Sequence, residues 1–298
     1  MKKIALLLSL WFALPSVSVV HAEEMPKIDL HWQTQSDPSL YTEAMANFLA
    51  AEIELLDGNN PQALMNYQAL ATALERILHR DNRSWEWKRD LALSYGRMAD
   101  IQLGQNDVAA AIKSYQAVLQ LVQKLAAANP KVVQWQRALA LNYINIGDAQ
   151  MRINDVHAAS KNYELGTRIR EKLFAEDESN RELQRDLAVA YDRVGNALLL
   201  QENVQGALNF YQGSVVLRER LVTANPKNYD WQTELVVSCW KLGKLPFGLN
   251  EATQRGYLQR GLSILRNLHN SGALTLDKTG WISRFESAIQ TLSLDRTR

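Results

Sequence analysis

Few residues of this sequence have the types and spacing that enzyme chemistry requires. Cys239 is the single cysteine, so no internal disulfide can form, and a lone cysteine in an apolar helical pattern is usually a small buried hydrophobe. The histidines are scattered and form no HExxH-type pair: His21, His31, His79, His157 and His269. No GxSxG motif and no phosphate-binding glycine loop occurs. The sequence therefore predicts no catalytic residue, no metal, no cofactor and no enzyme activity.

The charge balance also narrows the classes of partner. The chain has 33 basic and 32 acidic residues, a formal net charge of +1, which becomes −1 once Lys2 and Lys3 are removed with a leader. Nucleic acid and anionic membrane surfaces attract proteins with a large basic excess. We therefore expect no nucleic-acid partner.

The first 22 residues have the pattern of a bacterial secretory signal peptide. Lys2 and Lys3 precede the apolar run from Ile4 to Leu14, and Val20-His21-Ala22 provides a cleavage site. The alternative is a membrane anchor, but the run is shorter than the ~20 residues that a spanning helix needs. We predict a periplasmic protein that begins near Glu23, and the sequence does not separate periplasmic residence from secretion beyond.

An internal repeat is the main feature of the remaining chain. NPKVVQWQRAL at 129–139 returns as NPKNYDWQTEL at 225–235, and DESNRELQRDL at 177–187 lies midway, which gives a period of 48 residues. Trp87, Trp135 and Trp231 share one position in this period. A fixed period of this size is typical of stacked supersecondary units, and the recurring tryptophans are predicted to belong to the core.

Each repeat is predicted to contain two helices. Leu139, Tyr143, Ile146 and Gln150 form an amphipathic stripe, and Asn154-Asp155 follows as a turn and N-cap. Equivalent breaks occur at 58–60, 106–107 and 202–203, and Asn-Pro pairs at 129–130 and 225–226 end repeats. Strand and hairpin patterns are absent from the sequence. The repeats are therefore predicted to be entirely helical.

Small residues mark the contact between the two helices. Gly147, Gly195 and Gly243 recur on the first helix, and Ala159 and Ala207 recur on the second. Glycine lowers helix stability, so its recurrence favours a site where two helices approach closely. Two series of tyrosines are predicted to fill the space beside this contact: Tyr95, Tyr143 and Tyr191, and Tyr115, Tyr163 and Tyr211.

These residues resemble the tetratricopeptide repeat (TPR). Tyr191-x-x-Val194-Gly195 followed by Ala207 and Tyr211 matches its pattern, whereas Ala99 replaces the glycine in an earlier copy. The ordinary repeat has 34 residues, so the chain resembles a long bacterial variant. The resemblance implies an all-α, right-handed solenoid of about five stacked antiparallel helix pairs with a closing helix at 276–294. The expected organisation is a signal peptide (1–22), an N-terminal arm (23–38), the repeat domain (39–294) and a tail (295–298).

The resemblance also implies a binding groove on the concave side, lined by the first helices. Positions one, five and eight after the pattern tyrosine, with their neighbours, give the candidate partner-binding residues Arg97, Asp100, Ile144, Asn145, Asp148, Asp192, Arg193, Asn196, Trp240 and Lys244. The alternative is an ordinary solvated helix face, with Trp240 in the core or packed against the closing helix.

The leading functional hypothesis is an exported, non-enzymatic adaptor that binds another protein or a peptide on its concave surface. One alternative is a structural component of the cell envelope that self-associates. Another is a module that binds envelope glycan or assists an enzyme, although tryptophans that recur at one repeat position favour core packing over sugar stacking.

Overall fold

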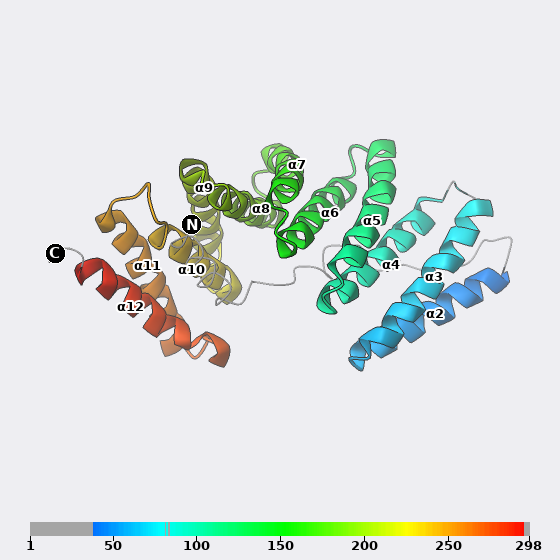
Figure 1. Cartoon of the computed structure of the whole chain (residues 1–298), viewed down its shortest axis with the longest axis horizontal. Coiled ribbons are helices and arrows are strands. Elements are labelled where there is room, and N and C mark those ends of the chain that lie inside the picture. The colour runs from blue at the N-terminus through cyan, green and yellow to red at the C-terminus, as the bar shows by residue number, and fades with distance from the viewer. Residues whose placement is uncertain (1–37, 81, 83, 295–298) are drawn as a thin grey trace. The chain divides into compact units, whose positions relative to one another are not determined.

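The computed structural model describes residues 38–80, 82 and 84–294, which contain helices and no strand (Figure 1). Five antiparallel pairs follow one another: α2 (Pro38–Leu56) with α3 (Asn60–Arg80), α4 (Trp85–Gly104) with α5 (Val108–Ala128), α6 (Val133–Arg152) with α7 (Val156–Glu176), α8 (Arg181–Leu200) with α9 (Val204–Ala224), and α10 (Tyr229–Gly243) with α11 (Glu251–Asn270). A 3₁₀ turn, Leu276–Lys278, then leads to α12 (Gly280–Leu294). The predicted all-α repeat of helix pairs with a closing helix is confirmed.

The described residues form two compact units, divided within α7 between Ile169 and Arg170. We call residues 38–169 the N-terminal unit and residues 170–294 the C-terminal unit. The predicted signal peptide, nearly all of the predicted arm and the tail lie outside the described residues. In the described part of the chain, no helix is both long and apolar enough to cross a membrane.

The helices recur with the spacing seen in the sequence. The first helices α4, α6, α8 and α10 begin at residues 85, 133, 181 and 229, at intervals of 48. Three turns inside pairs place Asn106, Asn154 and Glu202 in the left-handed region, with φ of 62°, 60° and 62°. The next residue caps the following helix in each case; for example, Asp107 accepts from the backbone N–H of Ala110 at 3.1 Å. The same turn therefore sets the starts of α5, α7 and α9.

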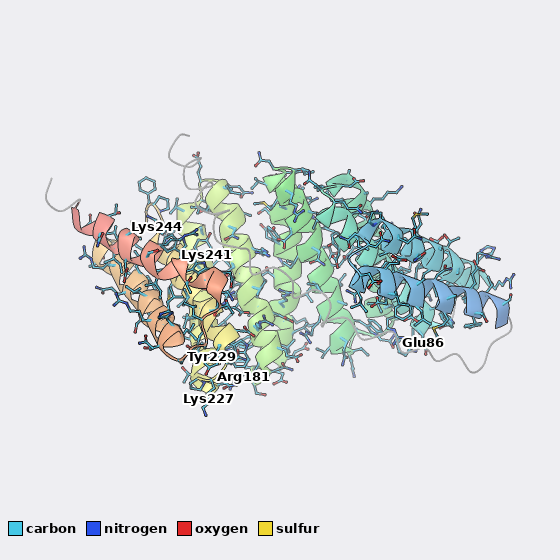
Figure 2. All side chains as sticks on the ribbon, turned by 90° about the horizontal axis from the view of Figure 1, so that it is seen from below. Glu86, Arg181, Lys227, Tyr229, Lys241 and Lys244 are labelled. Atoms are coloured by element: carbon cyan, nitrogen blue, oxygen red, sulfur yellow. The ribbon has the colours of Figure 1, made fainter. Side chains whose placement is uncertain are left out.

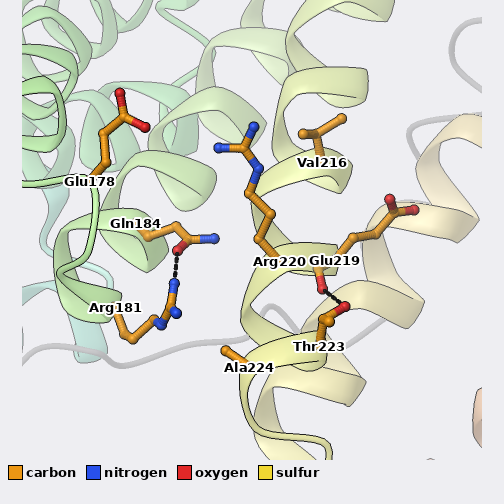
Figure 3. A pocket seen from close by; sticks show the side chains of 8 residues that line it. All are labelled: Glu178, Arg181, Gln184, Val216, Glu219, Arg220, Thr223 and Ala224. Carbon is orange, nitrogen blue, oxygen red and sulfur yellow. Dashed lines mark hydrogen bonds between the residues drawn. The ribbon is translucent and has the colours of Figure 1, made fainter.

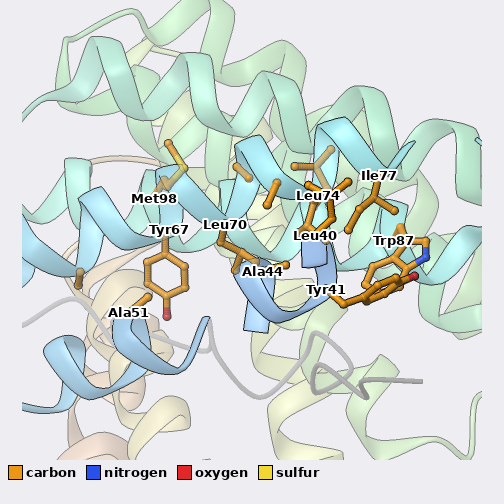
Figure 4. Close-up of a cluster of buried hydrophobic side chains, with 14 of the residues drawn as sticks. Leu40, Tyr41, Ala44, Ala51, Tyr67, Leu70, Leu74, Ile77, Trp87 and Met98 are labelled. Carbon is orange, nitrogen blue, oxygen red and sulfur yellow. The ribbon is translucent and has the colours of Figure 1, made fainter. Parts of the chain in front are cut away.

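The core of the N-terminal unit begins with an aromatic contact between α2 and α4. The rings of Tyr41 and Trp87 lie 5.0 Å apart, and Ile77 of α3 belongs to the same buried cluster (Figure 4). Tyr67 is fully buried further along this cluster, beside the buried Ala51 of α2. These contacts join the first helix pair to α4.

The core of the C-terminal unit ends differently, because α11 lacks a tyrosine at the pair contact. Leu258 packs against Gly243, where a Cβ would lie 2.5 Å from Leu258 Cγ, and Tyr257 is only half-buried. Leu258 is the eighth residue of α11, as Tyr211 is of α9, so the leucine replaces the tyrosine. Phe285 of α12 then packs at Gly261, and α12 covers α11 as predicted for a closing helix.

Candidate partner-binding surface

A hydrogen bond repeated in four helix pairs explains several of the predicted binding residues. A buried tyrosine of the second helix donates to a first-helix residue 15 positions earlier: Tyr67 to Glu52, Tyr115 to Asp100 (2.5 Å), Tyr163 to Asp148 (2.6 Å) and Tyr211 to Asn196 (2.9 Å). Burial, followed by the nearby carboxylate of Asp100, raises the pKa of Tyr115. Asp100, Asp148 and Asn196 therefore join the helices within a pair.

A second series of tyrosines joins neighbouring pairs. Tyr95 of α4 donates to Glu75 of α3, and Tyr143 of α6 accepts from Gln123 of α5 at 3.0 Å. These tyrosines were predicted to be core residues, but they are only half-buried, as is Tyr191. A phenol has an apolar ring and a polar hydroxyl, so it can pack at the rim of an interface and still reach a polar partner.

The N-terminal unit exposes only part of its predicted binding row. Arg97 is half-buried, with its Nε 3.9 Å from Glu52, and Asp100 and Asp148 are partly accessible. Ile144 is buried and contacts Gly166, and Asn145 is buried with no hydrogen bond to its Oδ1. Within this unit, the predicted row therefore offers a partner one arginine and two aspartates.

The C-terminal unit contains a buried ion network beneath the predicted row. Arg218 of α9 donates through Nη1 to Asp192 Oδ2 of α8 at 2.7 Å and to Ser238 Oγ of α10 at 2.6 Å. Lys241 Nζ lies 3.2 Å from the same Asp192 oxygen. Glu234 of α10 pairs with Arg185 at 2.7 Å and places its other oxygen 3.7 Å from Arg218 Nε. The network thus connects three helices.

The charges in this network shift each other's titration. Burial alone would raise the pKa of the Asp192 carboxyl, but Arg218 and Lys241 together hold it below its ordinary value. Burial lowers the pKa of the Lys241 amine to about 8, an effect that Arg218 and Arg193 strengthen and Asp192 opposes. Asp192 Oδ1 and Arg218 Nε have no hydrogen bond although both are buried. The network is therefore compact and incompletely satisfied.

One member of this network, Lys241, and two further cations, Arg193 and Lys244, reach the surface to different extents. Lys241 has a side-chain exposure of 11%, whereas Arg193 and Lys244 are half-buried. Figure 2 shows Lys241 and Lys244 together, away from Tyr229 at the start of the same helix. Trp240 does not contribute an exposed anchor, because it is buried with its ring 4.9 Å from that of Phe285 in α12. The accessible part of the row in this unit is therefore basic.

An open depression of about 660 Å³ lies elsewhere in the C-terminal unit, between the start of α8 and the end of α9. Its lining is Glu178, Arg181, Gln184, Val216, Glu219, Arg220, Thr223 and Ala224 (Figure 3). Arg181 donates to Gln184 at 3.0 Å, and Glu219 is engaged by Arg260. Carboxylates and guanidiniums alternate along the lining, so the depression does not select a ligand of one charge.

The groups capable of chemistry are dispersed in the described part of the chain. It contains no cluster of three or more His, Cys, Asp or Glu side chains that could hold a metal ion. Cys239 is buried, and burial raises the pKa of its thiol to about 12. A thiol with that pKa is almost entirely protonated at neutral pH, so Cys239 is a packing residue in this structure.

Comparisons with solved structures support the fold. The crystal structure of BtubC (BKLC) from P. vanneervenii is 16% identical with a TM-score of 0.51, over 88% of this chain and 92% of that chain. The crystal structure of the apo form of RapI is 12% identical with a TM-score of 0.53, over 87% of each chain. Comparison with family models and with curated proteins gives no match. Identities this low indicate a shared fold and nothing about ligands.

The helix pairs, their glycine–tyrosine contacts and these matches together define a TPR-like helical-repeat fold. Folds of this class generally serve protein interaction, because stacked helix pairs present long surfaces for a peptide or a partner's helix. The resemblance to the long bacterial variant stays a prediction.

Proposed function

We propose that this protein is an exported, non-enzymatic adaptor that binds an acidic segment of another protein through the first-helix surface of its C-terminal unit. The observation that supports the proposal most directly is the basic group formed by Arg193 of α8, Lys241 of α10 and Lys244, the residue that follows α10. The TPR-like fold supplies the general role, and the charge of the accessible side chains suggests which partner class fits.

The buried network supports a binding role for this surface, because it limits the movement of the surface cation Lys241. Its ammonium group lies 3.2 Å from Asp192 and 5.4 Å from the centre of the Tyr211 ring. A cation positioned in advance loses less conformational entropy when it meets a carboxylate. Export is proposed from the leader pattern of residues 1–22.

Affinity capture tests the binding proposal. Mature wild-type protein, beginning at Glu23, is crosslinked in its native envelope beside an Arg193→Glu/Lys244→Glu variant and a Lys172→Glu control. Lys172 lies on the second helix α7, its side chain is highly exposed, and it pairs with Glu176 of the same helix at 4.0 Å. Partners recovered with wild type and control, and lost with the double variant, would support the proposal.

Equal recovery of every partner by all three proteins would refute the basic surface as the binding site. Circular dichroism of each variant checks that the helices are intact. Cell fractionation with N-terminal sequencing tests export separately, and an unprocessed cytoplasmic chain would refute that part of the proposal.

A further inference from the structure

The first helix exposes one face, and three positions on that face, those of Thr42, Ala46 and Ile53, are buried in the other repeats. Leu49 and Ile53 of α2 are 52% and 58% exposed, and Thr42, Ala46 and Leu56 of the same helix are also exposed. These residues follow one another at steps of three or four, so they lie along one side of the helix. We call Thr42, Ala46, Leu49, Ile53 and Leu56 the open face of α2.

The repeat of 48 residues allows a direct comparison with the other first helices. Where α2 has Ile53, the later repeats have Ile101, Ala149, Ala197 and Leu245, all of them buried. Where α2 has Ala46, they have Ser94, Asn142, Ala190 and Ser238, again all buried. Most of the open face of α2 is therefore a stacking surface that the rest of the array covers.

The second helix of the preceding pair covers this face in the N-terminal unit. Asn142 of α6 donates through Nδ2 to the backbone carbonyl of Tyr115 in α5 at 2.9 Å, and Ile101 of α4 belongs to one buried cluster with Leu70 and Leu74 of α3. In the described residues no helix precedes α2 in the same way. An amphipathic helix in the position of a preceding second helix would fit the face.

We propose that the open face of α2 binds an amphipathic helix of another protein that carries lysine or arginine beside its apolar stripe. Ala46 and the half-buried Ala50 allow close approach of a backbone, and Leu49, Ile53 and Leu56 supply apolar area. The helix contains Glu43, Glu52 and Glu54, and Asp57 follows it. Arg76 of α3 pairs with Glu43 and Arg97 of α4 lies 3.9 Å from Glu52, so acidic residues remain in excess. A basic helix matches this charge.

Two other occupants fit less well. After cleavage at Ala22, the residues that precede α2 are 23–37, which include Pro26, whereas α3, α5, α7 and α9 each have 21 residues. A second copy of this chain would bring α2 against α2, and an antiparallel pair centred near Leu49 would set Glu43 close to the partner's acidic end. Like charges so placed oppose association.

A peptide of residues 108–128 is a defined probe, because this segment is α5, the helix that covers α6 in the protein. It contains Lys113 and Lys124 and no acidic residue. We expect saturable binding of the labelled peptide to mature protein by fluorescence anisotropy. Ile53→Glu should weaken it at least tenfold, and raising the salt concentration should weaken it too, because the lysines of the peptide attract the acidic residues of α2 across a distance.

The matched control is Met65→Glu on α3. Met65 is 62% exposed, and its equivalents Lys113, Lys161 and Asn209 are exposed too, so the position lies outside the stacking surface. This variant should bind the peptide as wild type does. So should Arg193→Glu/Lys244→Glu, which separates this inference from the proposed function.

Absence of saturable binding, or equal loss in Ile53→Glu and Met65→Glu, would overturn the proposal. A wild-type dimer in light scattering that Ile53→Glu converts to a monomer would assign the face to a second copy and also overturn it. Binding that appears only after residues 23–37 are deleted would assign the face to the N-terminal arm, with the same consequence.

Discussion

The two units fill the same repeat position with opposite chemistry. Residues 74, 122, 170 and 218 occupy one position of the 48-residue repeat. In the N-terminal unit this position holds the core residues Leu74 and Val122, whereas in the C-terminal unit it holds Arg170 and Arg218. Arg170 donates to the backbone carbonyl of Asp186 at 2.7 Å, and Arg218 holds Asp192. The same repeat position therefore accommodates either a buried apolar side chain or a buried arginine.

This difference shows that the repeat specifies helix positions more strictly than the chemistry between helices. An apolar core is stabilised by burial itself, whereas a buried ion network must recover the cost of removing charges from water. Such a network can favour one arrangement of its partners over others, and here the partners include the surface cation Lys241. The N-terminal unit, with Val122 at the matched position, provides the control.

Removal of Arg218 should have the largest effect. Arg218→Ala leaves the buried carboxylates of Asp192 and Glu234 without their shared partner, and we expect the free energy of unfolding to fall by about 3–5 kcal/mol. Val122→Ala at the matched position should cost only about 1–2 kcal/mol, because it removes two methyl groups. Urea denaturation followed by circular dichroism measures both, and equal losses would contradict the contrast between the units.

The glycine–tyrosine contact should behave alike in both units. A Cβ at Gly147 would lie 2.5 Å from Tyr163 Cε1, and a Cβ at Gly195 would lie 2.6 Å from Tyr211 Cε1. Gly147→Ala and Gly195→Ala should each destabilise by about 1–3 kcal/mol through overpacking. Gly104→Ala, where the new Cβ meets nothing within 4 Å, should be neutral or stabilising by up to about 1 kcal/mol. A marked difference in destabilisation between Gly147→Ala and Gly195→Ala would show that the glycine–tyrosine contact does not behave alike in the two units.

The pH dependence of stability should differ between wild type and Lys241→Met. The folded pKa of Lys241, about 8, lies below its ordinary 10.5, so above pH 8 the unfolded chain binds a proton that the folded chain has released. Stability from this group therefore rises with pH, by about 1–2 kcal/mol between pH 7 and 9.5. Thermal melts should show wild type gaining on the variant over that range, and parallel curves would indicate an unperturbed lysine.

The smallest effects should come from the tyrosine hydroxyls. Tyr163→Phe leaves Asp148 half-buried and able to bind water, whereas Tyr211→Phe leaves the buried amide of Asn196 without its donor. We expect losses of about 0.5–1 and about 1–2 kcal/mol, respectively. In Tyr211→Phe the ring beneath Lys241 is kept, so the loss of stability in this variant comes from the hydroxyl alone. The reverse order in denaturation experiments would show that the depth of the acceptor does not matter.

The helix pairs were predictable because their signals are local and repeated. Turn residues such as Asn106 and Asn154, and glycines that face tyrosines, leave a periodic mark in the sequence. The predicted start of the repeat domain at residue 39 differs from the start of α2 by one residue, and the closing helix predicted at 276–294 begins at Gly280. Helix and turn propensities, together with the 48-residue spacing, were sufficient to predict the helix pairs.

The binding row was harder to predict, because the position of a residue around its helix does not show which side chains of neighbouring helices face it. Asp192 and Trp240 share one repeat position, yet one holds Arg218 and the other packs on Phe285. The acceptor roles of Asp100 and Asp148 were missed, although their constant distance of 15 residues from a tyrosine is a signal in the sequence. The exposure of Ile53 depends on a neighbour that α2 lacks, which the residue type does not reveal.

The two series of tyrosine hydrogen bonds also bear on how such a chain can change in length. In the N-terminal unit one series closes each hairpin, as Tyr115 does with Asp100, and the other fastens adjacent hairpins, as Tyr95 does with Glu75. Excision or duplication of 48 residues would remove or add one bond of each kind and join segments that already match. Within this unit, such a change would keep both kinds of hydrogen bond at the new junction, because the joined repeats carry the same tyrosines.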